Sequence, residues 1–125
     1  MIAGIGVDIV AVARIARILE QHGDHFARRL LADSEWQDYL ATPARAPFMA
    51  KRFAAKEAFG KALGTGVAVP ATLHAVAVGH DALGKPEYRY DDRLAAHMCE
   101  RGLCAHLSIS DEDDNVVAFA LIERV

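Results

Sequence analysis

Residues 52–66 read RFAAKEAFGKALGTG, and this stretch determines most of the fold that the sequence predicts. Its apolar residues recur with helical periodicity, and Pro47 suits the first turn of a helix, so we expect one long helix ending near Leu63. One face of this helix is rich in alanine and contains Ala54, Ala55, Ala58, Phe59 and Ala62. Because alanine side chains are small, we expect this face to pack closely against a sheet.

The opposite face of the helix carries charges and glycines: Phe53, Lys56, Glu57, Gly60, Lys61 and Gly64. Glycine inside a helix costs about 1 kcal/mol relative to alanine, so Gly60 suggests that a ligand approaches this face closely. Glu57 and Lys61 have two interpretations. They form an ordinary i, i+4 ion pair worth about 0.2–0.5 kcal/mol, or they supply a carboxylate for a cation such as Mg²⁺ and a lysine for phosphate oxygens.

A strand is predicted at residues 2–9, IAGIGVDI, because its side chains alternate between two faces. One face carries Gly4, Gly6 and Asp8, and its glycines leave room for another element. Asp8 has two interpretations as well. It caps the helix that follows, or it is the second carboxylate of a site shared with Glu57.

The remaining pattern predicts one α+β domain, residues 1–125, with a mostly antiparallel sheet packed with helices. Helices are expected at residues 11–22, where Gly23 ends the helix, at 24–31, after a capping box at 34–37, and at 91–101. Strands are expected at 74–78, 86–90, 105–110 and 116–123. The last strand is apolar on both faces, so we expect another copy of the chain to cover one of them.

Composition narrows the function. The chain has 125 residues, is 53% hydrophobic and 25% charged, and carries a net charge of −3. It contains no apolar segment of the length that spans a membrane, no signal-peptide pattern and no basic stripe of the kind that binds nucleic acid. Cys99 and Cys104 fit neither a disulfide framework nor a usual metal motif, and the six histidines show no zinc spacing. We therefore expect a cytoplasmic protein with reduced thiols and with no membrane or nucleic-acid partner.

Several segments in order resemble holo-[acyl-carrier-protein] synthases, the small type of 4′-phosphopantetheinyl transferase. They are GIGVDIVAVARI near the N-terminus, RFAAKEAFGKALGTG, GKP at 84–86, HLSIS and AFALIE. The resemblance covers essentially the whole chain and implies the 4′-phosphopantetheinyl transferase-like fold. It also implies transfer of 4′-phosphopantetheine from coenzyme A to a serine of apo acyl carrier protein, with release of adenosine 3′,5′-bisphosphate, in support of fatty acid biosynthesis.

The resemblance also implies roles for individual residues. Asp8 and Glu57 match the family's Mg²⁺ ligands and Lys61 matches the lysine that meets the phosphates, so these three are the expected catalytic residues. The expected coenzyme A contacts are Lys61, Gly64, Pro86 and His106. Arg14 and Arg17 are expected to dock the acidic carrier, and the family assembles as a homotrimer with active sites between subunits.

One position departs from the family pattern. Asp111 stands where many members carry a histidine after the Ser-x-Ser strand, so a mechanism with that histidine as base does not carry over. A metal-bound water and Glu57 then stay open as acceptors of the serine proton. Two rival functions use the same residues differently: a non-catalytic carrier-binding module, and a nucleotide phosphohydrolase that needs no carrier protein.

Overall fold

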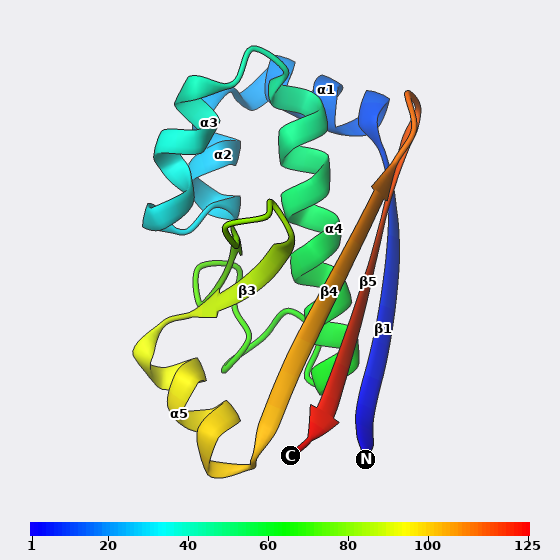
Figure 1. The fold of residues 1–125 in the computed structure, drawn as a ribbon. Helices are drawn as coiled ribbons and strands as arrows, with labels where there is room; N and C mark the ends of the chain where they lie inside the picture. Colours follow the sequence, from blue (N-terminus) through cyan, green and yellow to red (C-terminus); the bar gives the residue numbers. More distant parts are fainter.

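The computed structural model describes residues 1–125 as an α+β fold, which confirms the expected class (Figure 1). The elements in chain order are β1 (Ile2–Ala11), α1 (Val12–His22), α2 (Asp24–Leu30), the 3₁₀ helix η1 (Asp33–Glu35), α3 (Trp36–Ala41), α4 (Arg45–Leu63), β2 (Val76–His80), β3 (Pro86–Tyr90), α5 (Asp92–Glu100), β4 (Leu103–Asp111) and β5 (Asn115–Arg124). The strands form two antiparallel sheets, in the orders β1-β5-β4 and β2-β3.

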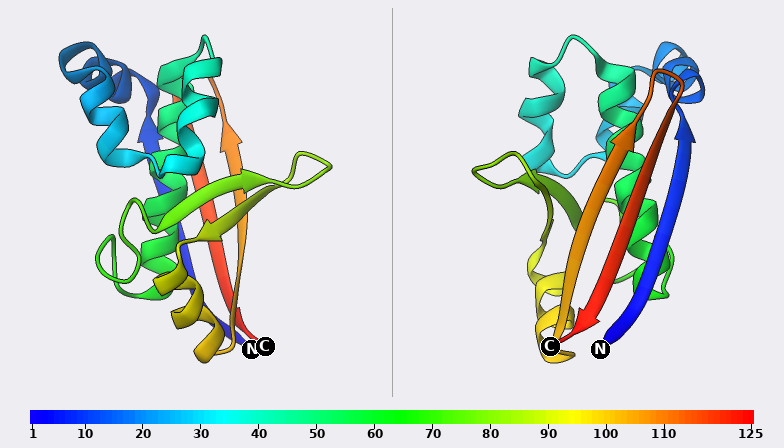
Figure 2. Two further views of the ribbon diagram at one scale, coloured as in Figure 1. Left: turned by 90° about the vertical axis from the view of Figure 1, so that its left-hand side faces the viewer. Right: turned by 45° about the vertical axis from the view of Figure 1, so that its right-hand side comes forward.

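The long helix α4 lies across one face of the three-stranded sheet (Figures 1 and 2). Its predicted alanine face is buried: Ala58 and Ala62 lie against β1, whereas Phe59 packs on Tyr88 and Tyr90 of β3 in the second sheet. The glycines of β1 make this close approach possible, because a Cβ at Gly6 would overlap the Ala58 carbonyl oxygen and lie 2.7 Å from the Ala62 nitrogen. The element that approaches the glycine face of β1 is therefore α4 itself.

The prediction for Gly60 was wrong. Gly60 is buried, and a Cβ there would lie 2.6 Å from the carbonyl carbon of Gly66, in the segment that follows the helix. The chain needs glycine at this position because its own backbone folds back against the helix. No ligand is required to explain it.

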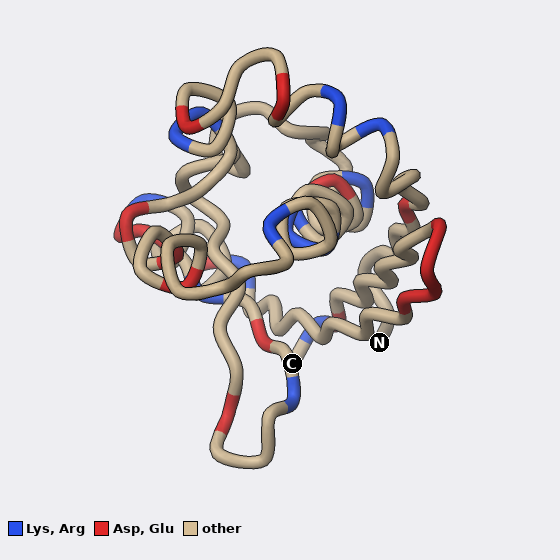
Figure 3. The backbone as a smooth tube through the Cα atoms, turned by 90° about the horizontal axis from the view of Figure 1, so that it is seen from above, with Lys and Arg blue, Asp and Glu red and all other residues tan.

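Lys56 also departs from the prediction, because it lies in the interior and not on the exposed polar face. Figure 3 looks down on the molecule, with α4 viewed nearly end-on, and shows that basic and acidic residues both occur along this helix. The Lys56 Nζ donates to the carbonyls of Leu30 at 2.8 Å and Leu73 at 2.7 Å, and it forms an ion pair with Glu35. Arg52 donates to the other Glu35 oxygen at 3.0 Å. Every polar atom of this buried network has a partner, which is the condition under which burial of charges is tolerated.

Glu35 also replaces the predicted capping box at 34–37. Its Oε1 accepts a hydrogen bond from the Ala32 backbone N–H at 2.9 Å, and its Oε2 accepts one from the Val78 N–H at 3.1 Å. Ser34 is exposed and caps nothing, and α3 begins without a side-chain cap. Glu35 thus ties η1 to α4 and β2.

Both faces of β5 are apolar, as the sequence indicated, but they differ in burial. Val116, Ala118, Ala120 and Ile122 face α4 and are buried. On the other face, Phe119 is 41% exposed beside Val7 of β1, which is 53% exposed. We call this open side the outer face of the sheet. None of the helices is both long and apolar enough to cross a membrane.

Candidate active site

The candidate site lies where the end of β1 meets the second half of α4. Asp8 follows Gly6 on the face of β1 that packs against α4, so its carboxylate is directed toward the helix. The Lys61 Nζ lies 3.1 Å from Asp8 Oδ1 and donates a hydrogen bond of 2.9 Å to the Val7 carbonyl. The Lys61 side chain is 51% exposed and that of Asp8 18%, so a ligand can reach both.

Glu57 lies one helical turn before Lys61, close enough to Asp8 for the two carboxylates to repel. Burial raises the pKa of Glu57, and the negative charge of Asp8 raises it further. The charges of Lys61 and Arg14 oppose this shift without cancelling it. A carboxylate whose ionisation is opposed by a neighbouring carboxylate favours the binding of a cation between the two.

The structure contains neither of the two simpler interpretations from the sequence, which were Asp8 as a helix cap and an ion pair between Glu57 and Lys61. Helix α1 begins after Ala11 and has no side-chain cap, so Asp8 is not an N-cap. The ion pairs of the chain include Lys61 with Asp8 and none between Lys61 and Glu57. Lys61 therefore links the helix to the strand.

Arg14 lies next to this site. Its guanidinium lies 5.9 Å from the centre of the Phe53 ring on α4. Its positive charge opposes the rise in the pKa of Glu57 without reversing it. Arg17 is exposed on the same helix and has no ion pair. A pocket of about 430 Å³ lies beside them, between α1, α2 and α4; it is lined by Ile18, His22, His25, Phe26, Arg29, Leu30, Phe53 and Leu73.

The other predicted contacts lie elsewhere in the chain. Gly64 ends α4 in a left-handed conformation, with φ of 90°, one turn beyond Lys61. Pro86 begins β3 in the second sheet. His106 pairs in register with Leu121, on the outer face of the sheet, whereas Asp8 pairs with Ala118 on the inner face. One chain alone thus does not bring His106 to the carboxylate pair.

Asp111, at the position of the family's histidine, is an exposed residue at the end of β4. Its Oδ2 lies 3.6 Å from the Nζ of Lys51 on α4. Sequence reasoning did not anticipate this pairing, nor the role of Phe53 next to Arg14. The signal for Phe53 was its position four residues before Glu57, on the same side of the helix.

Comparison with known proteins identifies the class. A family model for the 4′-phosphopantetheinyl transferase superfamily matches residues 4–120, so the chain belongs to this superfamily. The holo-[acyl-carrier-protein] synthase of Azoarcus sp. (strain BH72) is 67% identical over 123 residues, which are 98% of each chain. That of Aromatoleum aromaticum is 64% identical over 99% of each chain.

Solved structures agree with this assignment. The crystal structure of holo-[acyl-carrier-protein] synthase from Neisseria meningitidis has a TM-score of 0.95 at 44% identity, and the match covers 99% of this chain and 100% of that one. The enzyme from Bacillus anthracis in complex with CoA (3′,5′-ADP) has a TM-score of 0.85 at 32% identity, with 100% and 99% covered. The resemblance and the fold predicted from the sequence are thereby confirmed.

Proposed function

We propose that this chain is a cytoplasmic enzyme that transfers the 4′-phosphopantetheine group from coenzyme A to a serine of apo acyl carrier protein. In this proposal the reaction depends on Mg²⁺, which Asp8 and Glu57 hold, and Lys61 contacts the diphosphate of coenzyme A. The family and the close identity to holo-[acyl-carrier-protein] synthases support the transfer. The observation that carries the residue assignment is the convergence of the three side chains at one accessible point between β1 and α4.

The carboxylate pair suits Mg²⁺ in its donor chemistry. Mg²⁺ is commonly bound by one or two carboxylates and completes its coordination with water and substrate phosphates. The raised pKa of Glu57 reflects burial and unrelieved negative charge from Asp8, and a divalent cation relieves that charge. When bound, Mg²⁺ would neutralise charge on the diphosphate oxygens.

The chain's own residues then position the reacting groups. The serine oxygen of the carrier attacks the phosphorus next to pantetheine, the bond from that phosphorus to the bridging oxygen breaks, and adenosine 3′,5′-bisphosphate leaves. Lys61, held by the Val7 carbonyl and Asp8, offers N–H donors to the phosphate oxygens on which charge builds. The acceptor of the serine proton is either Glu57 or a water held at the metal, because the raised pKa of Glu57 applies to the site without a cation.

Docking of the carrier is assigned to Arg14 and Arg17. Both are exposed on α1, and the pocket next to them combines apolar walls, such as Ile18 and Phe26, with the basic Arg29. An acidic partner with an apolar contact residue fits this surface. Phe53 belongs to both regions, because it lines the pocket and contacts Arg14 beside Glu57.

We further propose that the active enzyme is a homotrimer whose active sites lie between subunits. Gly64 and Lys61 would contact coenzyme A from one subunit, while Pro86 and His106 complete its cleft. Since His106 lies on the opposite face of the sheet from Asp8, it would come from the neighbouring subunit. The exposed apolar residues of the outer face, among them Ile5 and Ile9, support burial against a second copy.

The decisive experiment is to incubate the chain with coenzyme A, Mg²⁺ and apo carrier and to follow the mass of the carrier. Asp8→Asn and Glu57→Gln should each fold and lower kcat by about 100-fold, a typical cost of removing one charge-stabilising group. Asp92→Asn, an exposed acidic residue of α5, is the control. Chelation of Mg²⁺ should stop the wild type.

Other outcomes would favour the rival functions. A carrier that binds but never gains mass would make the chain a binding module. Breakdown of coenzyme A without any carrier would make it a phosphohydrolase. Full activity of Asp8→Asn would remove Asp8 from the metal site.

A further inference from the structure

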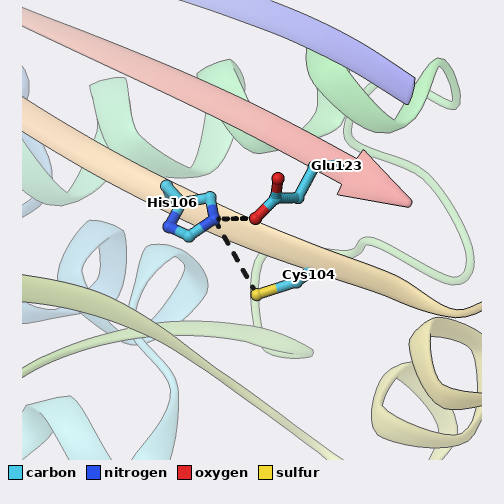
Figure 4. Close-up of side chains that lie close together, drawn as sticks. All are labelled: Cys104, His106 and Glu123. Carbon is cyan, nitrogen blue, oxygen red and sulfur yellow. Dashed lines mark hydrogen bonds and ion pairs between the residues drawn. The ribbon is translucent and has the colours of Figure 1, made fainter. Parts of the chain in front are cut away.

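A second group of side chains with metal-binding chemistry lies on the outer face of the sheet, near the ends of the chain. It consists of Cys104, His106 and Glu123 (Figure 4). The His106 Nε2 lies 2.8 Å from Glu123 Oε1 and 3.9 Å from Cys104 Sγ. One sulfur, one nitrogen and one oxygen atom thus lie within 4.8 Å of one another.

The sheet holds these residues together. Cys104 of β4 and Glu123 of β5 are direct partners in the antiparallel register, and His106 follows two residues later on the same face of β4. Cross-strand partners and i, i+2 neighbours are adjacent on one face of a sheet. The arrangement therefore rests on backbone hydrogen bonding and not on a flexible loop.

We propose that Cys104, His106 and Glu123 bind a Zn²⁺ ion. Thiolate, imidazole and carboxylate are the three ligand types that Zn²⁺ uses in proteins, with bonds of about 2.0–2.3 Å. A tetrahedral ion with such bonds separates its ligand atoms by about 3.3–3.7 Å. The observed separations bracket this value, so ordinary side-chain rotations bring all three atoms to the ion and leave a fourth position open.

In the proposed trimer His106 also completes the coenzyme A cleft, so Zn²⁺ and coenzyme A would compete for its side chain. Within one chain, however, the cluster and the carboxylate pair at Asp8 and Glu57 are separate. The two lie on opposite faces of the same sheet. Their donors also differ, since one offers oxygen alone and the other includes the softer sulfur and nitrogen. Softer donors select zinc-like metals over Mg²⁺, so the two ions would be sorted by ligand chemistry.

Metal binding at this cluster has a proton requirement. The Cys104 thiol must lose its proton, and His106 must offer an unprotonated ring nitrogen to the ion. Zn²⁺ binding should therefore release protons and strengthen as the pH rises.

The test uses the full chain, kept reduced with a non-thiol reductant and titrated with Co²⁺ as a spectroscopic probe. A thiolate-to-cobalt charge-transfer band should appear with one Co²⁺ per chain and vanish on addition of Zn²⁺. Excess Mg²⁺ should leave it unchanged. Cys104→Ser should abolish the band, whereas Cys99→Ser, at the other free cysteine, should keep it.

His106→Gln and Glu123→Gln supply the remaining ligand tests. Each should weaken Zn²⁺ binding, which calorimetry measures. Substitution of a residue that only supports a metal ligand costs roughly 10–100-fold in affinity, and loss of a ligand itself should cost at least as much. Retention of the band in Cys104→Ser, its loss in Cys99→Ser, or Zn²⁺ affinity unchanged in both glutamine variants would overturn the proposal. So would the absence of any band or binding heat in the wild type, which would leave an ordinary His106–Glu123 hydrogen bond.

Discussion

Lys61 and Asp8 join α4 to β1 across the inner face of the sheet, with 3.1 Å between the ammonium nitrogen and the nearest carboxylate oxygen. The pair holds a cation beside the two carboxylates while leaving about half of the lysine accessible. Lys61 thus has a dual effect: it offsets the repulsion between Asp8 and Glu57, and it provides a positive charge for an incoming anion.

The first prediction follows from this dual effect. Lys61→Met should lower kcat by about 100-fold, because donors aimed at developing charge typically contribute that much. The same substitution removes a competing cation from Asp8, so the Mg²⁺ concentration for half-maximal rate should fall. Steady-state kinetics over a Mg²⁺ series measure both quantities.

Lys85→Met, at an exposed lysine in the loop between β2 and β3, is the matched control. A rise in the Mg²⁺ requirement of Lys61→Met would mean that the lysine supports the metal site and does not compete with it.

The second prediction concerns acid stability. Burial alone would raise the pKa of Glu35, but the Lys56 ammonium and the backbone N–H groups of Ala32 and Val78 more than compensate and hold it below its usual range. A carboxyl whose pKa is depressed by folding stabilises the fold above its unfolded pKa, and this contribution is lost as the pH falls through the folded value. The free energy of unfolding should therefore decline steadily below about pH 4.5.

Glu35→Gln isolates this contribution. At pH 7 it should cost about 3–5 kcal/mol, because Lys56 and Arg52 lose their buried partner. In acid the wild type also loses the Glu35 charge, so the difference between the two proteins should narrow. Urea unfolding at a series of pH values measures it; a difference that stays constant with pH would exclude Glu35 as the titrating group.

Patterns of side-chain size and alternation predicted most of the fold. The alanine face of α4 and the glycine face of β1 are complementary surfaces, and the structure packs one on the other. Helix α5 also begins where its sequence predicted. Its N-cap is Asp91, whose side chain accepts a hydrogen bond from the Leu94 N–H at 2.8 Å. These features are local, so sequence order is enough to find them.

What the sequence did not predict depends on contacts between distant residues. Lys56 and Glu57 are neighbours in the chain, yet a 100° turn of the helix directs the lysine to Glu35 in the interior and the glutamate to Asp8. The metal-binding cluster was missed for a similar reason. Its cysteine and histidine lie two residues apart in a strand, and the third ligand comes from the register with β5.

The third prediction separates docking from chemistry on α1. Arg17→Glu should raise the KM for apo carrier by about tenfold and leave the KM for coenzyme A unchanged, because rim charges act on encounter and orientation. Arg14→Glu should also lower kcat, since Arg14 lies close enough to influence Glu57. Initial rates with each substrate varied in turn distinguish the two effects.

Arg93→Glu, on the exposed side of α5, provides a charge-matched control. The wild-type KM for carrier should rise with salt as screening grows. Equal changes of both KM values in Arg17→Glu would contradict a docking role for that residue.

The last prediction concerns assembly. Ala118 is fully buried against α4, so a charge there would disrupt the core of one chain and reveal nothing about subunits. Phe119 lies on the outer face of the central strand β5, where it is exposed beside Val7. If copies of the chain bury this face together, Phe119→Glu should convert a particle of about three times 13.6 kDa into one of 13.6 kDa. Light scattering measures the mass, and circular dichroism should show an intact fold.

Because we propose that His106 reaches the site from a neighbouring subunit, the dissociated variant should also lose transfer. Leu83→Glu, at an apolar residue that is 94% exposed in the loop between β2 and β3, should keep both mass and activity. A wild-type chain that is active as a monomer would contradict both the trimer and the shared site.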